Sequence, residues 1–286
     1  MSDVTQTELG YVGLGEMGSA MCRRLLDTGH SVTVFDLDDA AVASMVERGA
    51  REATSAAEVA TRAEVLSICV PADHHVLAVM SGVDGVDGGA NDGLTVLIHS
   101  TVHPDTMRAA HALAEPWGVS VHDACVAGGD QAALAGELVL FVSELDALSA
   151  PARSVVETYG SRVIDTGPPG SGAAVKIGVN VMTYAQQTAL CAAFELVAAQ
   201  GASTDALVEA WRHNGQFGPI IERFSALMGF PVASLAGMTD YLSNVVSIAQ
   251  KDLALASALG EGTPRGPSPV VSAISDHLPA VFGLPG

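Results

Sequence analysis

Lys176 and Asn180 carry the side chains best suited to chemistry in this sequence, since they stand four residues apart in the run from Gly170 to Asn180. Residues four apart share one face of a helix, so an ammonium and a carboxamide would project together. An ammonium on an apolar helix is costly to bury unless it has a function. Lys176 is therefore a candidate general acid/base. The alternative is that Lys176 extends to solvent and Asn180 makes an ordinary interhelical hydrogen bond.

A long helix must carry these two residues. The segment from about 171 to 199 is rich in alanine and apolar on most sides, which predicts a helix buried in the middle of the molecule. The small residues at its start, including Gly170 and Gly172, leave room for a ligand or for another stretch of backbone.

The N-terminal segment predicts a strand, a tight glycine turn, a helix and a second strand that ends at Asp36. In such a unit the first glycine makes the turn, the second lets a pyrophosphate approach, and the third lets helix and strand pack closely. We therefore expect a dinucleotide site in which Asp36 binds the adenosine ribose. The alternative is a structural glycine turn in another α/β protein. The expected cofactor-binding residues of the turn are Gly13, Leu14, Gly15, Glu16, Met17 and Gly18.

The residues around Asp36 favour NAD over NADP as the cofactor. Asp38 and Asp39 follow closely, and no arginine or lysine stands among them to neutralise a 2′-phosphate. Three carboxylates within four positions would repel that phosphate.

Further strands are predicted at 65–70, 95–99, 119–123, 138–142 and 161–164, and helical stretches around 40–47, 105–114 and 145–159. This alternation predicts a mainly parallel sheet covered on both faces, and ligands bind beyond the carboxyl ends of its strands. After 165–170, which is rich in proline and glycine, only helical patterns remain, at 204–211, 219–227, 241–259 and up to about 278. The fold class is therefore α/β: an N-terminal Rossmann doubly wound sheet (1–167) followed by an all-helical C-terminal domain (168–286).

Composition excludes several partners. The 286 residues carry a net charge of -19, which would repel nucleic acid and anionic membranes. The four cysteines are far apart, and neither a secretory signal nor a membrane-spanning run is present, so we expect a cytoplasmic protein. His99, His103 and His122 lack the spacing of a known zinc site, so no metal is predicted.

Four motifs together resemble the β-hydroxyacid dehydrogenase family, which includes 3-hydroxyisobutyrate dehydrogenase and has 6-phosphogluconate dehydrogenase as a larger relative. They are the glycine turn, the segment from Asp123 to Gly129, the helix with Lys176 and Asn180, and Lys251-Asp252-Leu253. The match covers the whole chain in order. On residues alone, Lys251-Asp252 would be interpreted as a solvated charge pair.

The resemblance implies a role for each matching residue. Lys176 would be the catalytic acid/base, and Asn180 would help to hold the substrate. The ribose and nicotinamide half of the cofactor would contact Val70, Pro71, Thr101 and Lys251. Backbone N–H groups of Ala127, Gly128 and Gly129 would bind a substrate carboxylate. The implied reaction is hydride transfer between NAD(P) and a 3-hydroxyacid or semialdehyde.

The sequence departs from the family at the substrate segment. Cys125 stands where the family usually has proline, Ala127 where it has serine, and the stretch ending in Glu144 lacks the usual paired glycines. We hypothesise a less polar pocket that takes a bulkier or less anionic carbonyl compound. Two alternatives are an imine reductase, which normally lacks the helix lysine, and a non-catalytic NAD-binding protein. The alanine- and leucine-rich helical domain predicts a homodimer or homotetramer.

Overall fold

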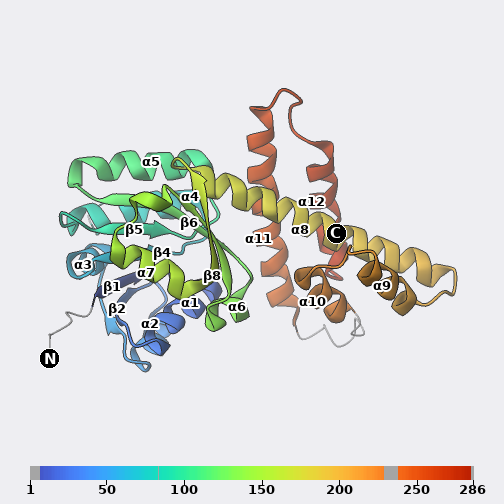
Figure 1. The fold of residues 1–286 in the computed structure, drawn as a ribbon, viewed down its shortest axis with the longest axis horizontal. Helices are drawn as coiled ribbons and strands as arrows, with labels where there is room; N and C mark the ends of the chain where they lie inside the picture. The colour runs from blue at the N-terminus through green and yellow to red at the C-terminus, as the bar shows by residue number, and fades with distance from the viewer. Residues whose placement is uncertain (1–6, 83, 229–237, 285–286) are drawn as a thin grey trace. The chain divides into compact units, whose positions relative to one another are not determined.

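The computed structural model describes residues 7–82, 84–228 and 238–284, drawn as the coloured ribbon in Figure 1. The chain forms two compact units, residues 1–176 and residues 177–286. The first unit contains the sheet, and the second consists of helices and turns in its described part.

The first unit is built on one eight-stranded sheet with the order β3-β2-β1-β4-β5-β6-β7-β8. Strands β1 to β6 are parallel, β7 runs antiparallel to β6, and β8 is parallel to β7. The order reverses between β1 and β4, which is the switch point where α/β sheets bind ligands. The strands are β1 (Glu8–Val12), β2 (Ser31–Phe35), β3 (Arg51–Glu52), β4 (Val65–Ile68), β5 (Thr95–Ile98), β6 (Ser120–Ala127), β7 (Leu138–Ser143) and β8 (Gly160–Gly167).

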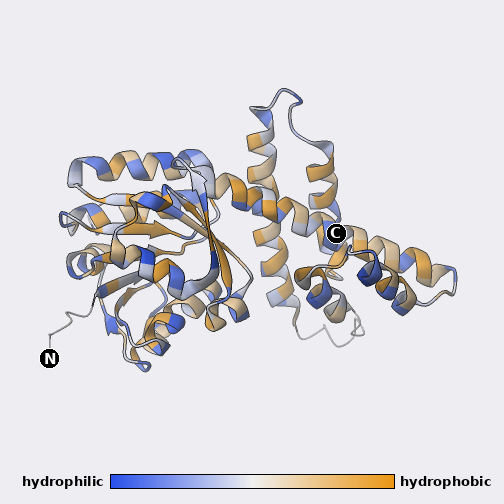
Figure 2. Ribbon diagram, viewed as in Figure 1, coloured by the Kyte–Doolittle hydropathy of each residue, from blue (hydrophilic) through white to orange (hydrophobic). Residues whose placement is uncertain are grey.

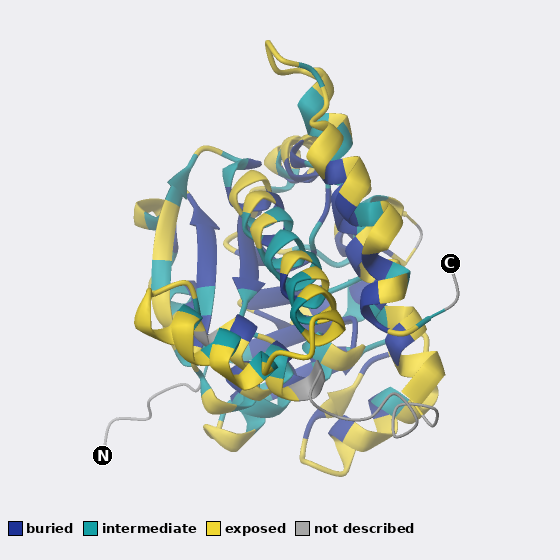
Figure 3. Ribbon diagram, turned by 90° about the vertical axis from the view of Figure 1, so that its right-hand side faces the viewer, coloured by how far each residue is buried: buried dark blue, intermediate teal, exposed yellow. Residues whose placement is uncertain are grey.

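Helices cover both faces of this sheet. Every residue of β4 and β5 is buried, which a strand achieves only when both of its faces are covered. Helix α1 packs against α6 and α7, whereas α4 packs against α5. Figure 2 shows the apolar strands between these helices, and Figure 3 shows them buried while the outer helix faces are exposed. The helices are α1 (Glu16–Asp27), α2 (Asp39–Val46), α3 (Ala56–Arg62), α4 (Asp73–Met80), α5 (Pro104–Ala114), α6 (Asp130–Ala135) and α7 (Ala150–Tyr159).

The predicted Rossmann sheet is confirmed, with several differences in its elements. Strand β3 and the helices α3, α4 and α6 were not predicted. Strand β6 continues four residues beyond Asp123 to Ala127. The helix predicted from 145 begins only at Ala150, after a short 3-10 turn at Leu145–Ala147. Ser149 caps it by accepting a hydrogen bond from the Ala152 N–H, and proline in its first turn suits a helix start.

The predicted helices of the second unit are confirmed in number and place within its described part. Helix α8 (Ser171–Ala199) begins in the first unit and continues into the second, followed by α9 (Thr204–His213), α10 (Pro219–Met228), α11 (Thr239–Glu261) and α12 (Pro269–Val281). Their core includes Leu253 and Leu278, and the rings of Phe224 and Phe282 meet edge to face. One expectation was wrong: α8 is not buried all round, since Met182 is 60% and Leu196 is 67% exposed.

Candidate functional site

The glycine turn between β1 and α1 has the conformation that its three glycines predict. Gly13 has a φ of +94°, and a Cβ there would lie 2.3 Å from the Cys69 carbonyl oxygen. A Cβ on Gly18 would lie 2.0 Å from the Gly13 carbonyl oxygen, so only glycine lets α1 start this close to the turn. A Cβ on Gly15 would meet nothing within 4 Å, and Gly15 caps α1 without a side-chain bond. The open space and the N–H groups of a helix N-terminus fit a pyrophosphate.

Asp36 lies against this turn, as predicted. Its Oδ2 accepts a hydrogen bond from the Leu14 N–H, and its Oδ1 accepts one from the Asp38 N–H at 2.8 Å. A carboxylate oxygen has two lone pairs, so both oxygens keep capacity to accept from ribose hydroxyls. Leu14 itself is buried, whereas Glu16 is exposed and Met17 is partly buried in the first turn of α1.

The next two strand ends hold Val70, Pro71 and Thr101. Val70 and Pro71 follow β4, and the Val70 N–H donates to the Ser100 Oγ at 2.9 Å, which ties the end of β4 to that of β5. Thr101 comes directly after this serine and is partly buried. The parallel register of β1, β4 and β5 brings these residues to the same edge of the sheet as the glycine turn.

The end of β6 forms the expected glycine corner. Gly128 and Gly129 have φ values of +139° and +82°, conformations that favour glycine, and Ala127 ends the strand. Cys125 is fully buried, and its thiol donates to the Ser100 carbonyl at 3.5 Å. The cysteine therefore packs inside the sheet, while Ala127 to Gly129 are at least partly accessible.

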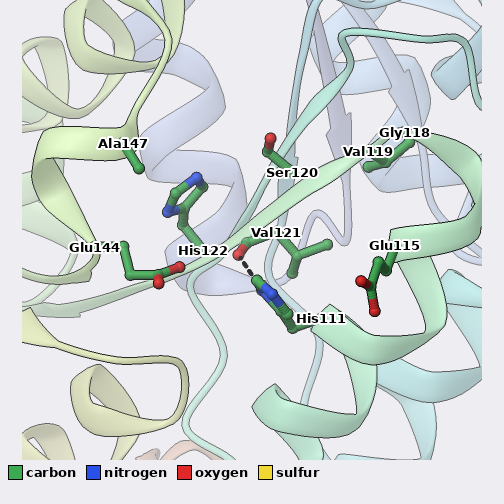
Figure 4. A pocket seen from close by; sticks show the side chains of 9 residues that line it. All are labelled: His111, Glu115, Gly118, Val119, Ser120, Val121, His122, Glu144 and Ala147. Carbon is green, nitrogen blue, oxygen red and sulfur yellow. Dashed lines mark hydrogen bonds between the residues drawn. The ribbon is translucent and has the colours of Figure 1, made fainter.

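Glu144 does not belong to this edge. Because β7 is antiparallel to β6, with Ala124 opposite Val142 and Ala127 opposite Val139, Glu144 lies near the amino end of β6. It lines a cavity of about 260 Å³ with His111, Glu115 and His122, as Figure 4 shows. Since dinucleotides bind at the carboxyl ends, this cavity is separate from the predicted site, and Glu144 gives no support to a less polar substrate pocket.

Asp123 was predicted only as the first residue of the segment 123–129, with no role of its own. In the structure it supports the start of α8. It is 2% exposed, and its carboxylate accepts from the Gly170 N–H and the Ala173 N–H, both at 3.1 Å. Asp123, which lies on β6, thus accepts from two N–H groups at the start of α8. A negative charge at this end of a helix also complements the helix dipole. A Cβ on Gly172 would lie 2.7 Å from both the Asp123 Cβ and the Phe141 carbonyl oxygen. The room left by Gly172 therefore accommodates other chain atoms, not a ligand.

Lys176 and Asn180 both lie on α8, one helical turn apart, as predicted. Lys176 is partly buried. Asn180 is 8% exposed, and its Nδ2 donates to the Asp252 Oδ2 of α11 at 2.7 Å. The interhelical hydrogen bond considered as the alternative for Asn180 therefore exists, and it occupies one side of the carboxamide.

Lys251 and Asp252 are not a solvated pair. Asp252 is 2% exposed, and the Lys251 Nζ lies 2.9 Å from its Oδ1. Tyr184 donates its hydroxyl to the Asp252 Oδ2 at 3.1 Å. Asp252 and Tyr184 were not predicted as site residues, because an acid beside a lysine has the pattern of a surface ion pair. Lys176 and Lys251 are the two lysines of the whole sequence.

The described residues contain no group of three His, Cys, Asp or Glu side chains arranged to hold a metal ion. None of the helices in the described ranges is both long and apolar enough to cross a membrane.

Similarity to known proteins extends over the whole chain. Residues 8–167 match the model of the NAD binding domain of 6-phosphogluconate dehydrogenase. An uncharacterised oxidoreductase of Mycobacterium tuberculosis is 34% identical over 281 residues, covering 97% of this chain and 94% of the relative. The NAD-dependent L-serine dehydrogenase of Pseudomonas aeruginosa is 31% identical over 265 residues, covering 91% and 88%. The structure of Mycobacterium tuberculosis 3-hydroxyisobutyrate dehydrogenase with L-serine has a TM-score of 0.77 at 25% identity, covering 96% and 94%.

More distant structures share the fold alone. Psf3 with NADP+ has a TM-score of 0.79 at 24% identity, covering 95% of this chain and 93% of that one. A reductive aminase of Aspergillus terreus has a TM-score of 0.62 at 19% identity, covering 96% and 93%. The relatives that reduce imines are thus more distant from this chain than the hydroxyacid dehydrogenases. On its sequence matches and its fold, the chain belongs to the β-hydroxyacid dehydrogenase family of NAD(P)-dependent oxidoreductases.

Proposed function

We propose that Lys176 is the acid/base of a hydride transfer between a nicotinamide cofactor and a 3-hydroxyacid or semialdehyde-type substrate. The observation that carries this proposal is the single face of α8 on which Lys176 and Asn180 stand one turn apart, with Asn180 buried. The relatives that act on L-serine and 3-hydroxyisobutyrate support the same substrate class.

The chain's own residues move the proton. When a carbonyl is reduced, the Lys176 ammonium donates a proton to its oxygen; when an alcohol is oxidised, the neutral amine accepts the hydroxyl proton. Asn180 orients the same oxygen through its carboxamide. The nicotinamide, when bound, gives or takes the hydride. The turn from Gly13 to Gly18, with Asp36, would hold the adenosine half.

Replacing Lys176 by Ala tests this proposal. Activity depends on proton transfer at one atom, so kcat should fall by about two to four decades in K176A while the dissociation constant for NADH, from a fluorescence titration, stays unchanged. Glu195→Ala, an exposed charge change on the same helix, is the matched control and should keep wild-type kcat. Full activity of K176A would refute the role of Lys176.

The substrate is proposed to be a carbonyl compound bulkier or less anionic than the aldehyde formed when 3-hydroxyisobutyrate is oxidised. Its support is Ala127, which offers no hydroxyl beside the glycine corner, so only backbone N–H groups there can bind a carboxylate. A panel of hydroxyacids and semialdehydes, followed by absorbance of NADH, checks this. If the short 3-hydroxyacids are the best substrates, the proposal is wrong.

We further propose that the enzyme prefers NAD to NADP. Asp36 is held at the glycine turn by backbone N–H groups, and Asp38 and Asp39 are exposed beside it, so a 2′-phosphate would meet three carboxylates. The expected result of parallel titrations is a KM for NADH at least about tenfold below that for NADPH, which corresponds to one modest charge repulsion. A lower KM for NADPH would exclude the preference.

We also propose a cytoplasmic location and assembly into a homo-oligomer. A cytoplasmic location is supported by four cysteines of which none forms a disulfide. Assembly into a homodimer or homotetramer is supported by the apolar residues that α8 leaves exposed.

A further inference from the structure

The Asp252 carboxylate is the centre of a buried polar cluster in the second unit. Its Oδ2 accepts two hydrogen bonds from α8, one from the Asn180 Nδ2 at 2.7 Å and one from the Tyr184 hydroxyl at 3.1 Å. Its Oδ1 lies 2.9 Å from the Lys251 Nζ. The side chain of Asp252 is 3% exposed, whereas that of Lys251 is 30% exposed. A buried carboxylate with two hydrogen-bond donors on one oxygen and an ammonium beside the other forms a fixed network rather than a surface ion pair.

The network determines which way the Asn180 carboxamide points. An ionised carboxylate can only accept hydrogen bonds, so the group of Asn180 that faces it must be the Nδ2 donor. The carbonyl Oδ1 of Asn180 is then turned away from Asp252. An amide rotated by half a turn would set two oxygens against each other, which the buried site disfavours.

Tyr184 strengthens this orientation from the same helix. Lys176, Asn180 and Tyr184 follow one another at intervals of four residues on α8, so one face carries all three. Burial and the neighbouring Asp252 raise the pKa of the Tyr184 phenol, which therefore stays a hydrogen-bond donor at every physiological pH. Two donors from α8 on a single oxygen fix both the carboxylate and the amide.

We propose that Asp252 and Tyr184 are positioning residues that hold the Asn180 carboxamide with its Oδ1 toward the hydroxyl of the reacting alcohol or, in the reduction direction, toward the ammonium that protonates the carbonyl. The Asn180 Oδ1 is then an acceptor of fixed direction. It receives a hydrogen bond from the substrate hydroxyl, or from the Lys176 ammonium when a carbonyl is bound. Asp252 also holds the Lys251 ammonium in place. This inference rests on the proposed hydroxyacid dehydrogenase function, in which Asn180 contacts the substrate.

The first experiment measures coupling through Asn180. Tyr184→Phe keeps the ring and removes one donor, so kcat/KM for the substrate should fall about three- to tenfold, and Asp252→Asn should lower it by about 10- to 100-fold. Tyr241→Phe and Asp240→Asn, exposed positions on α11, are matched controls with wild-type kinetics expected. In an Asn180→Ala background, Tyr184→Phe should no longer change kcat/KM, because the carboxamide through which Tyr184 acts is absent. Additive effects would overturn the proposal.

The second experiment does not depend on turnover. The sequence has four asparagines, and Asn91, Asn214 and Asn244 are exposed, so selective 15N-asparagine labelling resolves the Asn180 carboxamide against internal controls. Its protons should exchange more slowly than those of Asn214 and Asn244, and faster in Y184F than in wild type. Equal exchange for all four amides in wild type would overturn the proposal even if the enzyme is active. Protected amide protons in a protein that turns over no hydroxyacid would instead sink the proposed function. If D252N does not fold, the kinetics and the amide exchange of Y184F are sufficient to test the proposal.

Discussion

His99 joins three strands of the first unit through a chain of hydrogen bonds whose direction can be deduced. Its Nδ1 lies 2.7 Å from the Ala124 carbonyl, which can only accept, so Nδ1 carries the proton. The Nε2 must then accept from the Ser67 hydroxyl at 3.0 Å, and the Ser67 oxygen must accept from the Tyr159 hydroxyl at 2.9 Å. The neutral imidazole thus accepts from the buried Ser67 hydroxyl, which in turn accepts from Tyr159, beneath the cofactor edge of the sheet.

Protonation of His99 should destabilise the protein. Burial lowers the pKa of His99 from 6.5 to about 4, and a lowered folded-state pKa gives stability that is present above pH 6.5 and lost as the pH falls toward 4. Between pH 7 and pH 4.5 this group should cost about 2 to 3 kcal/mol of the free energy of unfolding. Urea titrations at the two pH values measure the free energy of unfolding. The decrease from pH 7 to pH 4.5 should be smaller in His99→Gln than in wild type by that amount. The exposed His277→Gln control should lose as much as wild type. Identical pH dependence in all three proteins would contradict the prediction.

At the scale of elements, the start of α8 is fixed by contacts that only small residues permit. Gly172 lies against the Asp123 side chain and the Phe141 carbonyl, and Asp123 in turn caps the helix. The position of Lys176, one turn further along, depends on this packing. Helix α8 is therefore anchored to the middle of β6 at Asp123 before it reaches Lys176, the proposed acid/base.

Two glycines of α8 allow a matched test of this anchoring. Gly172→Ala places a Cβ within 2.7 Å of chain atoms and should destabilise the protein by about 1 to 3 kcal/mol. Gly178→Ala meets nothing within 4 Å and should stabilise α8 by about 0.5 to 1 kcal/mol through helix propensity. Denaturant unfolding of both variants measures the difference. Equal stabilities would show that the close approach at Gly172 does not constrain the helix.

The sequence predicted the elements whose signals are local and repeated. The glycine turn, the strand Ser31–Phe35 that leads to Asp36 and the 29-residue helix α8 each carry such a pattern, and each was found. Helices α3, α4 and α6 have six to eight residues and were missed, because one or two turns give a weak periodic signal. Helix α2, of eight residues, was predicted despite its length. The reversed direction of β7 has no local signal either, because pairing direction is set by distant strands. That is why Glu144 was associated with the wrong edge of the sheet.

The candidate site divides in the same way. Lys176, Asn180 and the cofactor turn follow from spacing along one element. The roles of Asp123 and Asp252 depend on distant partners. Asp123 accepts from the Gly170 N–H, 47 residues away in the chain, and Asp252 accepts from the Asn180 amide, 72 residues away. Acid side chains with distant partners look like surface charges until the fold brings the donors to them. Buried polar networks are therefore the part of this site that only the structure could supply.

At the scale of the whole molecule, α8 exposes a continuous apolar stripe. Val175, Met182, Ala189 and Leu196 stand seven residues apart and are all exposed, so they share one face along the helix. Figure 2 shows apolar residues along α8. Exposed apolar residues repeated at heptad spacing are typical of a seam between helices.

This stripe predicts how the proposed homo-oligomer can be dissociated. In sedimentation velocity the wild-type chain, of 29.1 kDa, should sediment as a dimer or larger species, whereas Leu196→Glu should shift it toward the monomer by burying a charge in the seam. Leu113→Glu changes an exposed leucine on α5 of the first unit, 37% accessible, and should leave the assembly intact. The circular dichroism of both variants should match wild type, since neither leucine lies in a core. A wild-type monomer at tens of micromolar, or equal dissociation by both substitutions, would rule out assembly through α8.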